Sequence, residues 1–248
     1  MRWKAEALGQ LKRVPPVFDA VKRMSRRIGS RTPVYESLSR IAWALPENAA
    51  FIQIGSNDGI SIDPIREFVV ANPGWHGAFV EPVPRIFATL RRNYSYLRNR
   101  DFTFFNAAVS SGDGTKQLWK IRDASLHEFA PFASALASFD RNHLLRHFAG
   151  HPDLDAKIEA VPVPCMSYDE IRTKAQLSEV HLLHLDVEGH EAQILGAIDF
   201  SNSRPMAIVF EISHMAVSMK HEVFENLLDH GYKLMEAGAD CVATRLAA

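Results

Sequence analysis

The chain has 248 residues, enough for one α/β domain with a sizeable core and too few for a second full domain. Hydrophobic residues make up 47% and charged residues 23%, a balance that excludes a disordered or fibrous chain. No apolar run reaches the roughly 18 residues of a membrane-spanning helix, and we expect no secretory signal. The two cysteines are too few for a disulfide framework, which predicts reduced thiols and a cytoplasmic location.

The net charge of −1 is unevenly distributed. Residues 1–40 hold ten Lys and Arg against three acids, a local +7, so the rest of the chain carries −8. A basic arm can contact a membrane surface, nucleic acid or another anionic partner. The alternative is the solvated face of a helix. We expect residues 1–48 to form a basic helical arm and 49–248 to form the folded domain.

The expected elements begin in this arm, where prolines and glycines near 14–16 and 29–33 separate two short helical pieces. Apolar residues at helical spacing predict that the second piece packs on the domain: Leu38, Ile41, Ala42 and Leu45. From residue 51, short apolar runs alternate with amphipathic stretches, the pattern of βα repeats around a parallel sheet with helices on both faces. The expected strands are 51–54, 78–80, 102–109, 180–185 and 207–212. The expected helices are 62–70, with Asp63 as N-cap, 84–97 and 222–230.

The pattern changes at two places. After Gly231, the segments 232–235 and 241–245 flank a turn and predict a terminal antiparallel hairpin. An irregular insertion at about 122–160 is long enough to be a lid or binding loop. The predicted fold is therefore α/β and Rossmann-like, with a mostly parallel sheet and a C-terminal antiparallel hairpin.

The first expected strand runs into a turn bracketed by two glycines, Gly55 and Gly59. Glycine tolerates positive φ and lets the backbone approach a ligand closely. The spacing G-x-x-x-G lacks the middle glycine of the dinucleotide fingerprint, which argues against NAD or FAD. Taken alone, such a turn is equally well explained by packing.

Glu81 ends the second expected strand, where a carboxylate can accept hydrogen bonds from two ribose hydroxyls. Together with the glycine turn, it predicts a site for a nucleoside-type ligand. Asn106 either bonds an adenine edge or has a structural role. The candidate cofactor-binding residues are Gly55, Ser56, Asn57, Asp58, Gly59, Glu81 and Asn106.

A second group of polar residues follows the fourth and fifth expected strands. Its members, the candidate catalytic residues, are Asp186, Glu188, His190, Glu211 and His214. The carboxyl ends of parallel strands face the ligand crevice, so these side chains can position a substrate hydroxyl and take its proton. The alternative is capping of a helix N-terminus by Glu188 and Glu191.

Two histidines of the insertion, His143 and His147, have the i, i+4 spacing that places side chains on one helical face. The glutamate of the zinc motif H-E-x-x-H is missing, because Leu144 follows His143. We therefore expect no metal there, and the pair either lines a lid or belongs to a solvated face.

Several of these motifs resemble the FkbM family of S-adenosylmethionine-dependent methyltransferases over roughly residues 50–246. The most specific match is 183–191, LHLDVEGHE, supported by 54–59, 133–140, 199–200 and 228–232. The resemblance implies S-adenosylmethionine as cofactor, a class I methyltransferase sheet and O-methylation of natural products or sugars. Gln53 departs from the pattern, since class I methyltransferases often carry an acid two residues before the first glycine.

Methyl transfer to a hydroxyl benefits from a general base by roughly 10²–10⁴-fold. We expect Asp186 or His190 to be that base or to orient the hydroxyl, with Glu188 positioning it. A divalent cation on Asp186 and Glu211 would act similarly, although nothing in the sequence requires one. Two rivals stay open. One is methylation of nucleic acid or protein. The sequence has no Asn/Asp-Pro-Pro-aromatic string, and this absence argues against that alternative. The other is a non-catalytic module that docks through the basic arm.

Overall fold

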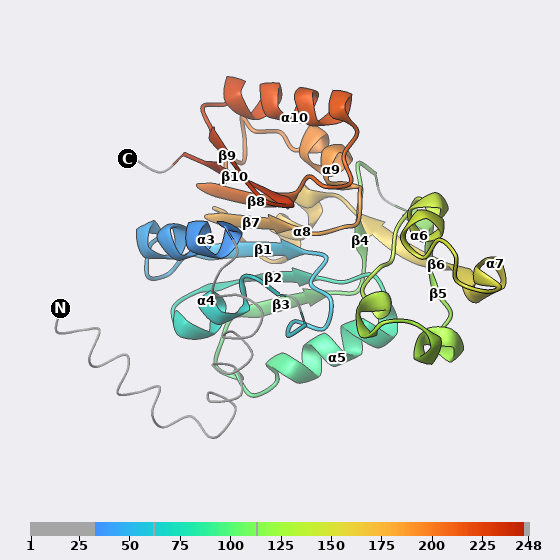
Figure 1. The fold of residues 1–248 in the computed structure, drawn as a ribbon. Coiled ribbons are helices and arrows are strands. Elements are labelled where there is room, and N and C mark those ends of the chain that lie inside the picture. The colour runs from blue at the N-terminus through green and yellow to red at the C-terminus, as the bar shows by residue number, and fades with distance from the viewer. Residues whose placement is uncertain (1–32, 62, 113, 246–248) are drawn as a thin grey trace.

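The computed structural model describes residues 33–61, 63–112 and 114–245, and its main sheet has the strand order β3-β2-β1-β7-β8-β10-β9 (Figure 1). The parallel strands are β1 (Ala50–Ile54), β2 (His76–Val80), β3 (Phe102–Phe105), β7 (Leu182–Leu185) and β8 (Ala207–Glu211). β9 (Lys233–Ala237) and β10 (Asp240–Thr244) form a hairpin, and β10 pairs antiparallel with β8. This order confirms the predicted mostly parallel sheet with a C-terminal antiparallel hairpin.

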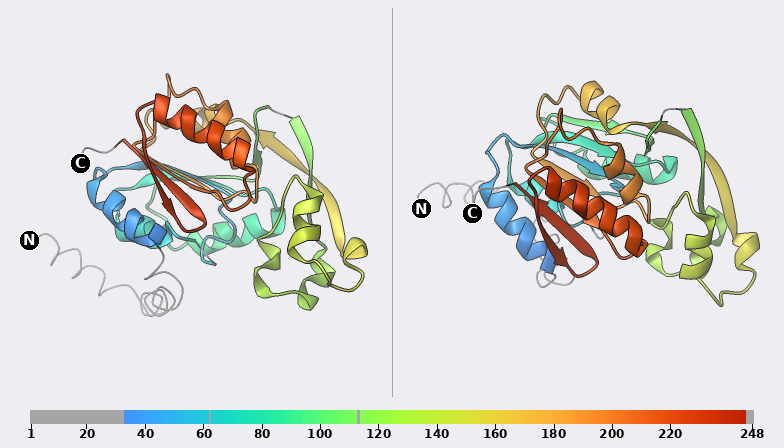
Figure 2. Two further views of the ribbon diagram at one scale, coloured as in Figure 1. Left: turned by 45° about the horizontal axis from the view of Figure 1, so that its top comes forward. Right: turned by 90° about the horizontal axis from the view of Figure 1, so that it is seen from above.

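Helices cover both faces of the sheet, because neighbouring residues of each strand point to opposite sides. On β1, Phe51 belongs to one apolar cluster, whereas Ile52 and Ile54 belong to the other. The first cluster includes α3 (Pro33–Ala44), α4 (Arg66–Ala71) and α5 (Pro84–Tyr94). The second includes α8 (Tyr168–Lys174), α9 (Glu191–Ala197) and α10 (Val217–Asp229). Figure 2 shows α5 and α10 on opposite sides of the sheet. Each fully buried side chain of this kind contributes about 1.5–3 kcal/mol.

Local sequence explains where several helices begin. Pro84 occupies the first position of α5, where its missing N–H is no loss. Ser167 and Glu170 form a reciprocal capping box at the start of α8. In α3, Leu38 and Ile41 are buried, as the helical spacing predicts, whereas the first helical piece of the arm lies outside the described residues.

The predicted boundaries differ most from the structure at three places. The helix expected from residue 62 begins at Arg66, because the Asp63 carboxylate accepts the N–H groups of Ile65 and Arg66 before the helical turn. The strand expected over 102–109 breaks after β3, and β4 (Ala108–Val109) joins a different sheet. The helix expected from residue 222 begins at Val217.

The insertion contains more regular structure than predicted. β5 (Gly114–Ile121) and β6 (Ile158–Met166) pair antiparallel and form a second sheet with β4. Between them lie the 3₁₀ helices η1 (Asp123–Glu128) and η2 (Pro131–Ser134), then α6 (Arg141–His147) and α7 (Leu154–Lys157). β6 tolerates Pro162 and Pro164 because β4 pairs only with its last two residues, Cys165 and Met166. In Figure 1 this unit lies beyond the carboxyl ends of β1 and β2.

Two further features concern apolar helices and cysteines. Within 33–61, 63–112 and 114–245, no helix combines the length and apolar composition needed to cross a membrane. Cys165 and Cys241 are both free and buried.

Candidate active site

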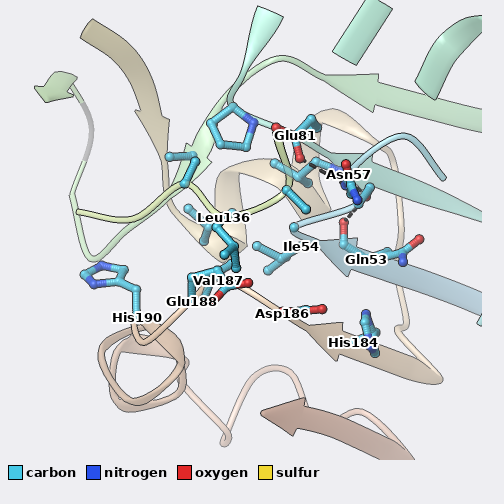
Figure 3. Close-up of a pocket in the computed structure, with 18 of the residues that line it drawn as sticks. Gln53, Ile54, Asn57, Glu81, Leu136, His184, Asp186, Val187, Glu188 and His190 are labelled. Carbon is cyan, nitrogen blue, oxygen red and sulfur yellow. Dashed lines mark hydrogen bonds between the residues drawn. The ribbon is translucent and has the colours of Figure 1, made fainter. Parts of the chain in front are cut away.

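A pocket lies at the carboxyl ends of β1, β2 and β7, the edge where open α/β sheets bind ligands. The insertion closes it from the opposite side with Phe132, Leu136 and Phe139. Figure 3 shows Asn57 and Glu81 on one side of the pocket and Glu188 and His190 on the other. The sequence-predicted residues that line the pocket are Gly55, Ser56, Asn57, Glu81, Asp186, Glu188 and His190.

The glycine turn holds the β1 loop against two neighbouring loops. Gly55 has φ +78°, and a Cβ there would lie 1.7 Å from the carbonyl oxygen of Asp186, so only glycine fits. The N–H groups of Gly55 and Ser56 both donate to Val80 O at 3.0 Å. The Ser56 hydroxyl donates to Gln53 O. These bonds fix the first wall of the pocket.

Asp58 and Gly59 shape the same turn from outside the pocket. The Asp58 carboxylate accepts the N–H groups of Ile60 and Ser61, at 2.9 and 2.7 Å. A Cβ on Gly59 would lie 2.6 Å from side-chain atoms of α5, so this glycine permits close packing of the turn on the helix. Neither residue lines the pocket.

Glu81 joins the loops after β1 and β2. Its side chain is buried, and its two oxygens accept the N–H groups of Asn57 at 3.0 Å and Val83 at 2.8 Å. Burial raises the pKa of Glu81 to about 7, although the two hydrogen bonds oppose this shift. The Asn106 amide donates to the carbonyl oxygens of Glu81 and Pro82. Asn106 does not line the pocket. Of the two alternatives for this residue, the contacts therefore match the structural role.

Three polar residues that the sequence does not mark as candidate ligands share one wall of the pocket. Gln53 and His184 are register partners on β1 and β7, and Gln53 Nε2 donates to Asp63 Oδ1 at 3.1 Å. Gln53 Oε1, Asp63 Oδ2 and His184 Nδ1 are buried without a hydrogen-bond partner. Burial raises the pKa of Asp63 to about 6 and lowers that of His184 to about 4. Buried polar side-chain atoms usually have a hydrogen-bond partner, so these three unpartnered atoms distinguish this wall of the pocket.

The opposite wall is built by the loop after β7. Glu188 and Gly189 both have positive φ, +55° and +98°, which turns the loop back toward the pocket. The buried Glu191 carboxylate accepts the N–H groups of Val187 at 2.8 Å and Gly189 at 3.0 Å. Of the two acids considered as caps, Glu191 therefore has that role, and Glu188 is left facing the pocket.

This wall has a distinctive electrostatic environment. Burial, followed by the charges of Glu188 and Glu211, raises the pKa of Asp186 well above its usual range. Burial raises the pKa of Glu191 to about 7. Burial lowers the pKa of His190 to about 4, and the nearby Lys116 charge lowers it further by a smaller amount. His190 Nε2 is also buried without a hydrogen-bond partner.

A histidine–glutamate cluster adjoins this wall. His143 Nε2 lies 3.0 Å and His214 Nε2 lies 3.8 Å from the same oxygen, Glu188 Oε2. Glu211 Oε1 is 3.4 Å from His214 Nε2, and neither of these residues lines the pocket. His143 is buried whereas His147 is exposed. The two histidines at i, i+4 spacing therefore lie in different environments, one in the interior and one in solvent.

The sheet order and the terminal antiparallel hairpin define a class I methyltransferase fold, and its pocket lies at the carboxyl ends of the parallel strands. The chain belongs to the FkbM methyltransferase family, whose domain matches residues 53–234. It is therefore an S-adenosylmethionine-dependent methyltransferase.

The chain is similar to several solved methyltransferase structures at low identity. The precorrin-6y C5,15-methyltransferase of Geobacter metallireducens is 14% identical, with a TM-score of 0.40 over 84% of each chain. A putative rRNA methylase of Clostridium thermocellum is 8% identical, with a TM-score of 0.46 over 89% of this chain and 99% of that one. Aeropyrum pernix fibrillarin, with bound S-adenosylmethionine, is 13% identical, with a TM-score of 0.40 over 84% and 74%. No protein of curated function matches the chain.

Proposed function

We propose that this protein transfers the methyl group of S-adenosylmethionine to a hydroxyl of a sugar, glycan or other natural product. One observation carries the proposal: a single pocket joins the Gly55–Glu81 wall to a wall bearing Asp186 and His190. The first wall suits a nucleoside and the second suits a hydroxyl. The residues after β7 are Asp186-Val187-Glu188-Gly189, not the Asn/Asp-Pro-Pro-aromatic string of enzymes that methylate base or protein nitrogens.

In this proposal the adenosyl group lies along Gly55 and Glu81. Each Glu81 oxygen already accepts one backbone N–H and keeps a further lone pair for a ribose hydroxyl. The methionine end reaches Gln53, Asp63 and His184. Its ammonium group has three N–H donors, and Asp63 Oδ2 and Gln53 Oε1 are buried acceptors without partners. Asp63, which lies beside Gln53, thus supplies the carboxylate that class I methyltransferases often carry at the position of Gln53.

The reaction is an in-line displacement. The acceptor oxygen attacks the methyl carbon, the carbon–sulfur bond breaks as the carbon–oxygen bond forms, and the sulfonium leaves as a neutral thioether. The hydroxyl proton passes to the Asp186 carboxylate, while the Nε2–H group of neutral His190 donates a hydrogen bond to the hydroxyl oxygen and orients it. Leu136 and Phe139 of the insertion exclude water from the reacting atoms.

Location and partners complete the proposal. The two free, buried thiols support a reducing compartment, the cytoplasm. The basic segment 1–40 supports contact with an anionic surface or substrate.

The test is transfer of a labelled methyl group from S-adenosylmethionine to panels of hydroxylated compounds and glycans, read by mass spectrometry. Asp186→Asn should lower turnover by about 10²-fold or more and keep cofactor affinity within a few-fold. Label found on an amine or a nucleobase, or equal loss of turnover and affinity in Asp186→Asn, would contradict the proposal.

A further inference from the structure

A polar cluster beside the pocket has the composition of a metal site. We propose that His143, Glu188 and His214 bind a divalent transition-metal ion of the zinc class. His143 comes from α6, Glu188 from the loop after β7, and His214 from the segment after β8. The three residues are far apart in the sequence, so only the folded chain brings them together.

The distances suit one shared ion. The three donor atoms lie within 4.8 Å of one another. The two imidazole nitrogens lie 3.0 and 3.8 Å from Glu188 Oε2. In a tetrahedral zinc site with bonds of about 2.1 Å, neighbouring ligand atoms stand about 3.4 Å apart. The two distances fall on either side of that value and the third pair of atoms lies within 4.8 Å, so the spacing is compatible with one shared ion.

The buried nitrogen of His143 is the second observation. The residue is 5% exposed, and its Nε2 forms no hydrogen bond. Glu188 Oε2 lies 3.0 Å from this nitrogen as an ion-pair contact and does not form a hydrogen bond with it. Leaving a buried polar atom without a partner costs free energy. A metal ion supplies that partner, because neutral imidazole binds metals through its ring nitrogen.

A group of acidic side chains adjoins the cluster. Carboxylate oxygens of Asp186, Glu191 and Glu211 lie within 4.8 Å of one another next to this cluster. In the described part of the chain, the salt bridges of Glu188 and Glu211 are to histidines, with no Lys or Arg. Two imidazoles with one carboxylate favour zinc or a similar ion over magnesium or calcium, which prefer oxygen ligands throughout.

The backbone holds the carboxylate ligand in place. Glu188 has φ +55°, a conformation that a residue with a side chain rarely adopts. The Ser138 hydroxyl of the insertion donates to its carbonyl oxygen at 2.9 Å. Backbone strain of this kind persists where the surrounding structure fixes it, commonly at functional sites.

The position of the cluster connects the ion to the pocket. Glu188 lines the pocket, and the His214 side chain is 34% exposed, so solvent reaches the cluster. Three protein ligands leave at least one coordination position for water or for an oxygen of the acceptor.

The test uses the full-length chain without an affinity tag, treated with a chelator and then titrated with Zn²⁺ by calorimetry. We expect one equivalent of tight binding in the wild type. His214→Ala should weaken it by about 100-fold or more, because it removes a direct ligand. The matched control is His221→Ala, since His221 is exposed and pairs with Glu225 at 3.1 Å on α10. This control should bind Zn²⁺ like the wild type.

A second readout uses Co²⁺, whose visible absorption reports tetrahedral coordination and should disappear in His214→Ala. Melting temperatures in chelator verify that both variants fold. Equal Zn²⁺ binding by wild type and His214→Ala, or no one-equivalent binding by the wild type, would overturn the metal site. Titration with S-adenosylhomocysteine is separate. Its failure would refute the proposed methyl transfer and leave the metal result standing.

Discussion

At Gly55, a hydrogen atom in place of a side chain lets the β1 and β7 loops meet. The backbone at φ +78° costs an L-residue about 1–2 kcal/mol, and a Cβ would also overlap the Asp186 carbonyl oxygen. We expect Gly55→Ala to lower the melting temperature by several degrees and to weaken S-adenosylhomocysteine binding by about tenfold or more. The control is Gly196→Ala in α9, where a Cβ meets open space and helix propensity improves. A Gly55→Ala protein that melts and binds like the wild type would show that the close approach of the two loops does not require glycine.

Glu81 gives cofactor binding a pH dependence. Burial raises its pKa from the usual 4.5 to about 7, with Asp58 as the charged neighbour that adds to the shift. Its ionisation therefore destabilises the folded protein as pH rises from 4.5 through 7. Ribose hydroxyls donate to the ionised carboxylate, so affinity should rise from pH 6 to 8, by at most about tenfold per pH unit. Calorimetry should show this rise of affinity with pH in the wild type and no such rise in Glu81→Gln. The same slope in both proteins would mean that a group other than Glu81 causes the pH dependence of binding.

Asp63 can be tested with two ligands that differ at the methionine end. S-adenosylhomocysteine carries the amino group, whereas methylthioadenosine lacks it. A hydrogen bond to a charged group contributes about 1.5–3 kcal/mol, so Asp63→Asn should weaken the first ligand by about 10–100-fold. Methylthioadenosine should bind within about threefold of the wild type. Glu81→Gln is the contrasting variant, because both ligands share the ribose and should weaken together. Parallel losses in Asp63→Asn would mean that Asp63 acts on the pocket as a whole.

At the scale of elements, the sequence predicts the parts whose signals are local. Continuous apolar runs predict β1, β2, β7 and β8, and Gly238 marks the terminal hairpin. The sequence does not predict β5, because its first four residues are exposed and show no alternation of apolar and polar residues. It does not predict β6, because prolines interrupt that strand. Its position predicts Asp63 as the N-cap of a helix, but the N-cap of α4 is Ile65, and the Asp63 carboxylate accepts the N–H groups of Ile65 and Arg66 from one turn earlier in the chain. Its free oxygen in the pocket depends on how β1 and the loop before α4 pack, which no local pattern records.

The insertion has an apolar cluster of its own, separate from those of the main sheet. Leu144 of α6 is fully buried with Ile121, Leu136 and Ile158. Leu144→Ala should cost about 2–5 kcal/mol, mainly within this unit. Hydrogen exchange should therefore accelerate in β5, α6 and β6 and stay unchanged in β1 and β7. Leu183→Ala, in the main core, should accelerate exchange across the whole sheet. Uniform acceleration in Leu144→Ala would show that the insertion unfolds together with the sheet.

At the scale of the whole molecule, the residues that line the pocket all fall between 53 and 190, and the basic charge is concentrated ahead of them. A chain lacking residues 1–32 should therefore keep the cofactor site. Ligand at 100 times its dissociation constant stabilises a protein by about 2.7 kcal/mol, which raises the melting temperature of a domain this size by about 5–10 °C. We expect S-adenosylhomocysteine to produce the same rise in the full and shortened chains. Anionic lipid vesicles should bind the full chain only, since its first 40 residues carry the +7 charge. A shortened chain that folds without responding to the ligand would place part of the cofactor site in the N-terminal segment.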